Sequence, residues 1–446
     1  MALFKAYDLR GKVPEELNED IAYKIGRAYT ELYSPQKVAV GFDIRNESPA
    51  ITSALIKGLL DGGTDVLNIG LCGTEEVYFA TFHHKLDGGI MVTASHNPKG
   101  HNGMKLVGPE ARPISADNGL MDIKALVEKD SFPKPTNPGQ EDINEDKSAY
   151  IQHLLSYVNT GSLVPTKIVV NPGNGGAGII LPLLAEHLPF EFIYLNEEPN
   201  GDFPNGVPNP LLLENQKATQ EAVLANQADI GIAWDGDFDR CFFFDHNGRF
   251  IEGYYLVGLL AETLLLKQPG SAIVHDPRLI WNTIEQTEAA GGRTVQSKCG
   301  HAFIKAVMRE EDAVYGGEMS AHHYFKQFSY CDSGMIPWLL IAELMGKSGK
   351  SMKELVDERM LAYPCSGEIN FRVEDTQPVI DRIKAHFEPQ AEEVDTSDGI
   401  SMSFGNWRFN LRASNTEPLL RLNVESKRDE ALLKQSLQSI VDLIEA

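Results

Sequence analysis

Short β-rich runs alternate with helical patterns along most of this chain, and this rhythm occurs three times. Such alternation is typical of layered α/β units with a largely parallel sheet. The expected strands are Val38–Phe42, Asp65–Ile69, Gly89–Val92, Lys167–Val170, Glu191–Leu195, Asp229–Ala233, Ala272–Val274, Thr294–Gln296 and Ala313–Tyr315. In the first unit, the expected helices are Pro49–Asp61 and Glu75–His84. Three similar α/β units are the simplest account of the pattern.

The final part of the chain differs from these units. Glu368–Val373 and Trp407–Leu411 resemble antiparallel strands, and Glu430–Ile444 has the pattern of a closing amphipathic helix. The polar stretch Pro133–Glu145 marks the end of the first unit. We therefore predict α/β domains at 1–145, 146–250 and 251–362, and a smaller α+β domain at 363–446.

Composition excludes several classes of partner. The chain has 446 residues and a formal net charge of -23, so nucleic acid and anionic membranes are poor partners, and an anionic substrate needs a local basic pocket. The five cysteines are scattered and lack a C-x-x-C pair, which favours reduced thiols over disulfides or zinc. The N-terminal residues lack the apolar core of a signal peptide, so a cytoplasmic protein is expected.

A serine loop follows the first unit's third expected strand, in the stretch Thr93–Pro98. The carboxyl ends of strands in α/β sheets commonly carry the active site. Ser95 can act there as a nucleophile if His96, a lysine or a metal activates it. A polar turn in which Asn97 and Pro98 end the strand is an equally good interpretation of this loop alone.

An acidic loop follows the strand that ends at Ala233. Asp235, Asp237 and Asp239 can place three hard oxygen ligands on one small cation, and Gly236 allows a tight turn. Magnesium or calcium would fit, but an EF-hand needs a longer loop flanked by helices. An acidic turn without metal is disfavoured, because the charges would repel each other.

Two further loops carry weaker signals. Glu318 can accept a hydrogen bond from one sugar hydroxyl, and Ser320 can donate one to the adjacent hydroxyl. A buried Glu–His pair at a turn explains that loop equally well. The stretch Arg412–Pro418 combines a guanidinium, hydroxyls, an amide and backbone N–H groups, which suits one phosphate dianion. A capping turn is the simpler interpretation of that stretch in isolation.

A glycine-rich turn offers a rival function. The stretch Gly173–Gly178 follows an expected strand and has Glu197 downstream, so it formally satisfies the dinucleotide-binding fingerprint of an oxidoreductase. This interpretation gives no role to the serine, the aspartates or the Arg412 loop. A tight turn that needs glycines for close packing is preferred.

Taken in order, the four loops resemble those of the α-D-phosphohexomutases, the family of phosphomannomutases and phosphoglucomutases. The resemblance extends from Tyr7 to the C-terminal helix, and Tyr7–Gly11 and Asn102–Lys105 match further signatures. It implies three homologous mixed-sheet α/β domains and a smaller phosphate-binding domain around a central cleft. It also implies a magnesium-dependent phosphoserine enzyme that uses hexose phosphates, with hexose 1,6-bisphosphate as intermediate and activator.

The resemblance also implies residue roles. The catalytic set is Ser95, His96, Arg10, Lys105 and His301, and the metal set is Ser95, Asp235, Asp237 and Asp239. The substrate-binding set is Tyr7, Arg240, Arg278, Lys298, Glu318, Ser320, His322, Arg412, Ser414, Asn415, Thr416 and Arg421. Arg10, Lys105 and His301 are the candidates for proton transfer or charge neutralisation.

Two stretches depart from the family pattern. Glu47 replaces a serine in Gly41–Ser48, a segment expected to lie off the transfer chemistry, and Arg278 stands where many relatives have lysine. The Glu318–Phe325 segment resembles the phosphomannomutase branch, which would supply mannose 1-phosphate for GDP-mannose and surface polysaccharide. Phosphoglucomutase or dual specificity is the close alternative, phosphoglucosamine mutase a distant one, and a silent sugar-phosphate binder stays open. A monomer or a dimer is expected.

Overall fold

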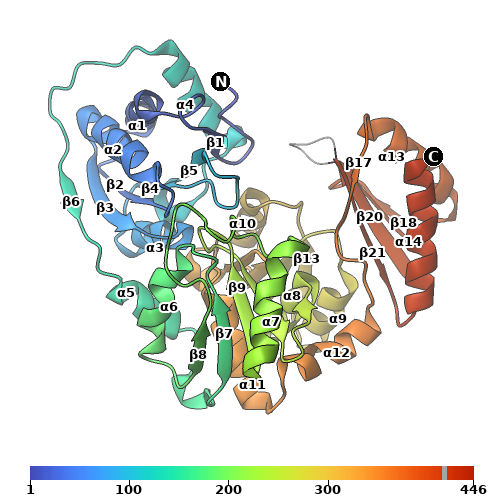
Figure 1. The fold of residues 1–446 in the computed structure, drawn as a ribbon. Coiled ribbons are helices and arrows are strands. Elements are labelled where there is room, and N and C mark those ends of the chain that lie inside the picture. The colour runs from blue at the N-terminus through green and yellow to red at the C-terminus, as the bar shows by residue number, and fades with distance from the viewer. Residues whose placement is uncertain (414–418) are drawn as a thin grey trace. The chain divides into compact units, whose positions relative to one another are not determined.

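The computed structural model describes residues 1–413 and 419–446, and these residues form two compact units. The first unit comprises Met1–Phe250 and Gln327–Gly349, and the second comprises Ile251–Lys326 and Lys350–Ala446. Figure 1 labels their helices and strands. No helix in the described ranges is long and apolar enough to cross a membrane.

The first sheet of the first unit is mixed. Its strand order is β1 (Leu9–Lys12), β5 (His101–Val107), β4 (Gly88–Val92), β2 (Lys37–Phe42), β3 (Asp65–Leu71) and β6 (Glu141–Ile143). The β2, β3, β4 and β6 strands pair in parallel, whereas β5 is antiparallel to β1 and β4. Its helices are α1 (Glu19–Tyr33), α2 (Ser48–Gly62), α3 (Thr74–His83) and α4 (Leu120–Lys129).

Helices cover both faces of this sheet, because successive strand residues point to opposite sides. Val38 and Val40 of β2 join the core that contains residues of α1, α2 and α4, while Ala39 joins a core with residues of α3. The α1 and α2 helices pack closely, since a Cβ at Gly26 would lie 2.4 Å from the Leu55 carbonyl oxygen. This packing leaves the carboxyl ends of the strands for loops.

The second sheet of the first unit has the order β10 (Cys241–Asp245), β9 (Ile230–Trp234), β7 (Lys167–Asn171) and β8 (Glu191–Tyr194). The β10 and β9 strands are antiparallel, and the others are parallel. Its helices are α5 (Ser148–Leu155), α6 (Ala177–Ala185), α7 (Leu213–Asn226) and α11 (Ile336–Ser348). This unit also holds β16 (Cys331–Asp332), and at β11 (Phe250–Ile251) the chain passes to the second unit.

The second unit begins with another α/β arrangement. Its strands run in the order β13 (Arg293–Gln296), β12 (Ala272–His275), β14 (Tyr315–Gly317) and β15 (His323–Phe325). Only the pairing of β14 with β15 is antiparallel in this set of described strands. Its helices are α8 (Gly253–Lys267), α9 (Trp281–Ala289), α10 (His301–Glu310) and α12 (Met352–Ala362).

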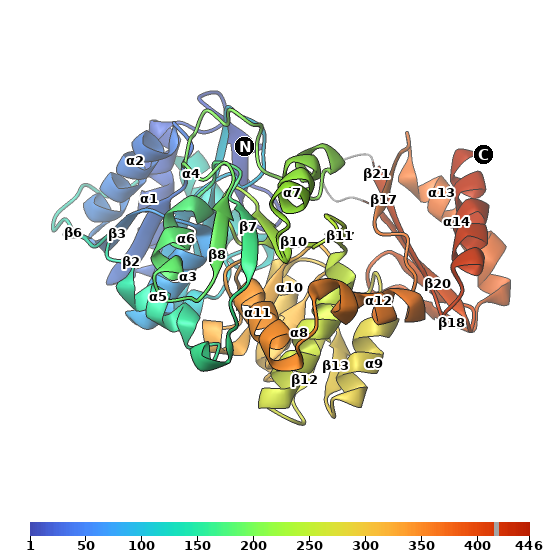
Figure 2. The ribbon, with the colours of Figure 1, turned by 60° about the horizontal axis from the view of Figure 1, so that its bottom comes forward.

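The last sheet is antiparallel throughout its described pairings. Its order is β17 (Ile369–Arg372), β21 (Leu419–Ser426), β20 (Trp407–Ala413), β19 (Ile400–Ser403) and β18 (Glu393–Asp395). Figures 1 and 2 show α13 (Thr376–Phe387) and α14 (Glu430–Glu445) along one face, where their apolar residues share one core with the strands. The predicted fold class, three mixed α/β segments and a smaller α+β segment, is confirmed, whereas the central cleft and the domain boundaries remain predictions.

Two elements differ from the expectation. The strand expected at Ala313–Tyr315 begins at Tyr315 and continues through two glycines. Strands usually disfavour glycine, but packing requires it here, because a Cβ at Gly316 would lie 2.6 Å from the Met308 sulfur. The connecting stretch Pro133–Glu145 contains β6, an exposed edge strand that pairs with β3 through its backbone. Neither feature has an apolar signature in the sequence.

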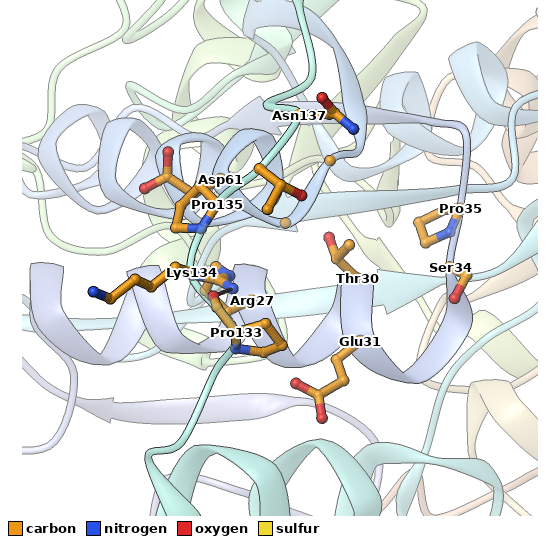
Figure 3. Close-up of a pocket in the computed structure, with 13 residues that line it drawn as sticks. Arg27, Thr30, Glu31, Ser34, Pro35, Asp61, Pro133, Lys134, Pro135 and Asn137 are labelled. Carbon is orange, nitrogen blue, oxygen red and sulfur yellow. Dashed lines mark hydrogen bonds between the residues drawn. The ribbon is translucent and has the colours of Figure 1, made fainter.

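The connecting stretch also lines a cavity in the first unit (Figure 3). This cavity has a volume of about 330 Å³ and lies among α1, the end of α2 and residues 133–137. Arg27 on α1 donates to the Pro133 carbonyl at 2.5 Å, and this hydrogen bond links the connecting stretch to α1. None of the predicted site residues that the structure describes lines this cavity.

Candidate active site

Ser95 lies in a strained loop directly after β4. Its φ of 48° is in the left-handed region, which a non-glycine residue adopts at some energetic cost. The loop holds this conformation partly because the Ser95 N–H donates to Thr93 Oγ1 at 2.9 Å. The Ser95 hydroxyl oxygen lies 3.2 Å from Asp235 Oδ2 and 3.1 Å from His96 Nδ1, and the residue is 3% exposed.

Arg45 holds the backbone of the serine loop through hydrogen bonds. Its guanidinium donates to the carbonyl oxygens of Ser95 at 2.7 Å, Asn97 at 2.6 Å, Pro98 at 3.1 Å and His101 at 3.0 Å. Buried Asp43 accepts from the Thr93 hydroxyl at 2.7 Å and from the Arg45 N–H. The segment Gly41–Ser48 thus supports the backbone of the serine loop, and its place off the transfer chemistry stays a prediction.

The three aspartates follow β9 and converge. One carboxylate oxygen from each of Asp235, Asp237 and Asp239 lies within 4.8 Å of the others, and all three residues are buried. The loop packs on the serine loop, because a Cβ at Gly236 would lie 2.8 Å from the Ser95 carbonyl oxygen. The structure thus brings Ser95 and the three aspartates together at one place, as the sequence predicts.

This cluster suits a divalent cation. Asp237 is 0% exposed, and its Oδ1 atom has no hydrogen-bond partner among the described residues. A buried carboxylate oxygen without a partner is unfavourable, and a hard cation held by oxygen ligands would satisfy it. The residues present therefore fit a metal ion at Asp235, Asp237 and Asp239.

Basic side chains surround the carboxylates. Lys105 on β5 lies 2.7 Å from Asp237 Oδ2 and 2.5 Å from Asp239 Oδ2, and Arg240 lies 2.7 Å from Asp235 Oδ2. Burial and the neighbouring aspartates raise the pKa of Asp235 to about 6, although Arg240 opposes the shift. Burial opposes charge on Lys105, but Asp237 and Asp239 outweigh it and raise its pKa. Lys105 therefore stays protonated.

Arg10 and His96 lie beside the serine. Arg10 is on β1, pairs with Asp8 at 2.8 Å and donates to Asn97 Oδ1 in the serine loop. His96 Nδ1 accepts from Arg240 Nη2 at 2.8 Å. Because a guanidinium only donates, this nitrogen carries no proton in that arrangement. Half-buried Tyr7 precedes β1.

Thr74 contacts the aspartate cluster, and the sequence alone did not point to it. It begins α3 at the carboxyl end of β3, and its hydroxyl donates to Asp237 Oδ2. It also lies 3.3 Å from Lys105 Nζ. Thr74 could have been found by its place after a parallel strand, since such strand ends share one edge of the sheet.

The second unit holds the expected sugar loop. Glu318 is buried, and its carboxylate accepts from the Gly300 N–H at 2.9 Å and the Tyr324 hydroxyl at 2.6 Å. Ser320 Oγ lies 3.3 Å from Arg278 Nη2. Arg278 in turn pairs with Asp276 Oδ2 at 2.7 Å, and Asp276 accepts from the Met319 N–H. Arg278 therefore helps to position the loop.

The expected phosphate loop is described in part. Ser414, Asn415 and Thr416 lie outside the described residues. Arg412 and Arg421 are Cα partners on β20 and β21. Of the other predicted residues, His301 begins α10, Lys298 lies 5.8 Å from the Phe303 ring centre, and His322 stacks on Tyr324.

Acid should weaken the second unit through His323. Burial, with a smaller effect of His322, lowers the pKa of His323 to about 3, and its Nδ1 lies 2.7 Å from the Tyr315 hydroxyl. The unfolded imidazole keeps its ordinary pKa near 6.5, so the unfolded state binds the proton first and stability falls as pH falls below that value. We expect this residue to contribute a loss of about 2 kcal/mol between about pH 7 and pH 5.

Chemical denaturation at the two pH values measures this loss. His323→Gln cannot titrate, so its unfolding free energy should depend less on pH than that of the wild type. An identical pH dependence in the two proteins would contradict the assignment.

The glycine-rich turn packs against the acidic loop. The Gly176 N–H donates to the Gly236 carbonyl at 3.1 Å, and a Cβ at Gly175 would lie 2.9 Å from the same oxygen. A Cβ at Gly178 would lie 1.9 Å from the Glu197 carbonyl oxygen. These close approaches explain the glycines without a dinucleotide.

Family models describe the whole arrangement. The phosphoglucomutase/phosphomannomutase models of domain I, domain II, domain III and the C-terminal domain match residues 1–134, 148–248, 252–363 and 368–443. The chain belongs to the phosphoglucomutase/phosphomannomutase family. The resemblance inferred from the four loops is therefore confirmed.

Individual relatives of the family align over nearly the full chain. A protein named "Phosphohexose mutases" from Xanthomonas campestris pv. campestris (strain B100) is 60% identical over 441 residues, which cover 99% of this chain and 98% of the relative. A phosphomannomutase from Salmonella montevideo is 56% identical and covers 100% and 99%. A crystal structure of a phosphoglucomutase/phosphomannomutase family protein from Burkholderia thailandensis aligns with a TM-score of 0.88 at 29% identity, covering 100% and 97%.

Proposed function

We propose that this family member is a magnesium-dependent phosphomannomutase that interconverts mannose 6-phosphate and mannose 1-phosphate. The observation that carries the proposal is the Ser95 hydroxyl beside Asp235 in the three-aspartate cluster. Relatives at 50–56% identity over the full chain bear the name phosphomannomutase, which supports mannose as substrate. The product would serve GDP-mannose and polysaccharide synthesis.

The proposed chemistry transfers one phosphoryl group between Ser95 and the sugar. The bond between phosphorus and Ser95 Oγ breaks, and phosphorus forms a bond to the oxygen of the free sugar hydroxyl. The proton that this hydroxyl loses is taken up, by the end of the transfer, by the departing Ser95 oxygen. The reverse transfer from the other end of the hexose 1,6-bisphosphate regenerates phosphoserine. Such a transfer depends mainly on positioning and charge stabilisation. We propose the bisphosphate as the activator, since it can phosphorylate Ser95.

Mg²⁺ would be held by Asp235, Asp237, Asp239 and the phosphoserine, and when bound it would neutralise charge on the phosphoryl group. Lys105 and Arg240 would add positive charge, and the raised pKa of Lys105 makes it a poor proton acceptor. Arg10 would hold the serine loop through Asn97. We propose His96 and His301 as the remaining members of the catalytic set.

The other predicted residues would bind the substrate. Glu318 and Ser320 would contact sugar hydroxyls that both orientations of the intermediate present. Arg412, with Ser414, Asn415, Thr416 and Arg421, would hold the phosphate that is not reacting. Tyr7, Arg278, Lys298 and His322 complete the proposed set. We also propose a cytoplasmic protein that acts as a monomer or a dimer, with no nucleic-acid or membrane partner.

A coupled assay tests the proposed substrate. Purified protein with Mg²⁺ is given mannose 1-phosphate or glucose 1-phosphate, and formation of the corresponding 6-phosphate is followed. We expect turnover of mannose 1-phosphate. Comparable turnover of glucose 1-phosphate would indicate dual specificity, which the name of the Xanthomonas relative favours. No turnover of either compound would contradict the proposal.

Arg412→Ala should raise KM with little effect on folding. Charge-assisted hydrogen bonds contribute about 1.5–3 kcal/mol, so the expected rise in KM is about tenfold to a hundredfold. Steady-state kinetics and the thermal midpoint measure the two effects. Arg372→Ala, an exposed arginine on β17 of the same sheet, is the matched control and should leave KM unchanged. A KM that stays at the wild-type value in Arg412→Ala would refute the role.

A further inference from the structure

One carboxylate lies among three arginines in the second unit. Glu368 directly precedes β17, and its Oε2 atom lies 3.1 Å from Arg412 Nη2 and 3.4 Å from Arg278 Nη1. Its Oε1 atom lies 3.8 Å from Arg421 Nη1. Glu368 thus occupies the guanidinium cluster to which we assign phosphate binding.

Arg412 and Arg421 share one described carboxylate. Arg278 contacts Asp276 at 2.7 Å and 3.0 Å and also lies 3.6 Å from Glu318 Oε1, so carboxylates other than Glu368 balance its charge. Glu368 is then the described carboxylate that pairs with both Arg412 and Arg421. Two guanidinium groups that share one carboxylate can accept a more highly charged anion in its place.

Unused hydrogen-bond donors point the same way. The Nε atoms of Arg412 and Arg421 are buried and have no hydrogen-bond partner among the described residues. The contacts of Glu368 are also long, because charge-assisted N–H···O bonds usually measure about 2.7–2.9 Å. Within the part of the chain that the structure describes, a single carboxylate therefore leaves donors of these arginines unused, whereas a phosphate has more acceptor oxygens.

We propose that Glu368 is an internal anion that competes with the non-reacting phosphate of the substrate for Arg412 and Arg421. This inference rests on the proposed function. When the phosphate binds, it displaces the carboxylate from these two guanidinium groups. When the phosphate leaves, Glu368 returns and restores the contacts, which lowers the free-energy cost of release.

Competition of this kind has a use in a mutase. The hexose bisphosphate must leave the phosphate-binding arginines and turn end for end between the two transfers. Arginines that held phosphate too tightly would slow this step, because release would expose unpaired cations. Glu368 would therefore weaken ground-state binding and speed turnover.

Glu368→Gln tests the proposal, since it removes the charge and keeps the shape. We expect the dissociation constants of inorganic phosphate and mannose 6-phosphate, measured by calorimetry, to fall about threefold to tenfold. KM and kcat should both fall, because release becomes slower. Glu374→Gln removes the same charge from an exposed position of the same domain and should change none of these values.

A structural role for Glu368 makes the opposite prediction. If the carboxylate only holds the arginines in place, Glu368→Gln weakens phosphate binding and raises KM, and that result would overturn the proposal, as would unchanged binding. Glu368→Asp serves if the glutamine variant does not fold. Its shortened side chain should also tighten phosphate binding, by a smaller factor, and unchanged or weaker binding would again reject competition.

The wild-type protein separates the two levels of inference. If it turns over mannose 1-phosphate but neither Glu368 variant binds phosphate more tightly, only the competing-anion proposal fails. If it neither turns over a hexose phosphate nor binds inorganic phosphate, the proposed function fails, and this inference fails with it.

Discussion

Ser95→Ala should lower kcat by at least about a thousandfold, because the substitution removes the hydroxyl oxygen that is proposed to carry the phosphoryl group. The serine hydroxyl lies beside Asp235, and Arg45 holds the backbone around it through four carbonyl oxygens. Removing one oxygen leaves this backbone network intact. We therefore expect a folded protein with an unchanged thermal midpoint that has lost its turnover.

The same coupled assay measures this loss, with both proteins at equal concentration. Ser148→Ala, an exposed serine at the start of α5, is the matched control and should retain full activity. Turnover within tenfold of the wild type in Ser95→Ala would show that the phosphoryl group is carried elsewhere.

Asp237→Asn should reduce both metal affinity and turnover, by about a hundredfold or more in kcat at moderate Mg²⁺ concentration. The Oδ1 atom of Asp237, which has no hydrogen-bond partner among the described residues, is the clearest indication that the cluster suits a cation, while its Oδ2 atom is held by Lys105 and Thr74. The neutral amide keeps the size of the side chain but weakens ion binding and leaves Lys105 with less negative charge.

Titration of activity with Mg²⁺ and calorimetric Mg²⁺ binding measure the two effects of Asp237→Asn. Chelation with EDTA should abolish wild-type turnover, and added Mg²⁺ should restore it. Asp122→Asn on α4 removes an exposed carboxylate from the same unit and should behave as wild type. An Asp237→Asn protein with wild-type Mg²⁺ dependence would place the ion elsewhere.

The sequence was most informative where chemistry and strand ends coincide. Ser95 and the three aspartates each follow a buried apolar strand, and parallel strands present their carboxyl ends at one edge. Their proximity could therefore be predicted from the alternating pattern together with the loop composition. The α/β rhythm was equally clear, since buried strands such as β4 and β9 are short, apolar and bounded by turn residues.

Contacts between segments far apart in the sequence could not be predicted. Arg45 acts through backbone carbonyls of a loop more than fifty residues away, and a carbonyl leaves no mark on residue type. Glu368 lies in an ordinary strand pattern, and only the fold brings Arg278 and Arg412 to it. The β6 strand is exposed, so it lacks the alternation that identifies half-buried strands.

The central claim is that Ser95 carries the phosphoryl group that the enzyme transfers. Peptide mass spectrometry tests it directly in two steps: after incubation with mannose 1,6-bisphosphate and Mg²⁺, and again after excess mannose 6-phosphate with a heavy-oxygen-labelled phosphate is added. We predict one phosphoryl group on the peptide that contains Ser95, and its replacement by the labelled group as turnover regenerates phosphoserine. An unmodified Ser95 peptide, or a phosphoryl group that does not exchange with the sugar phosphate, would contradict the account.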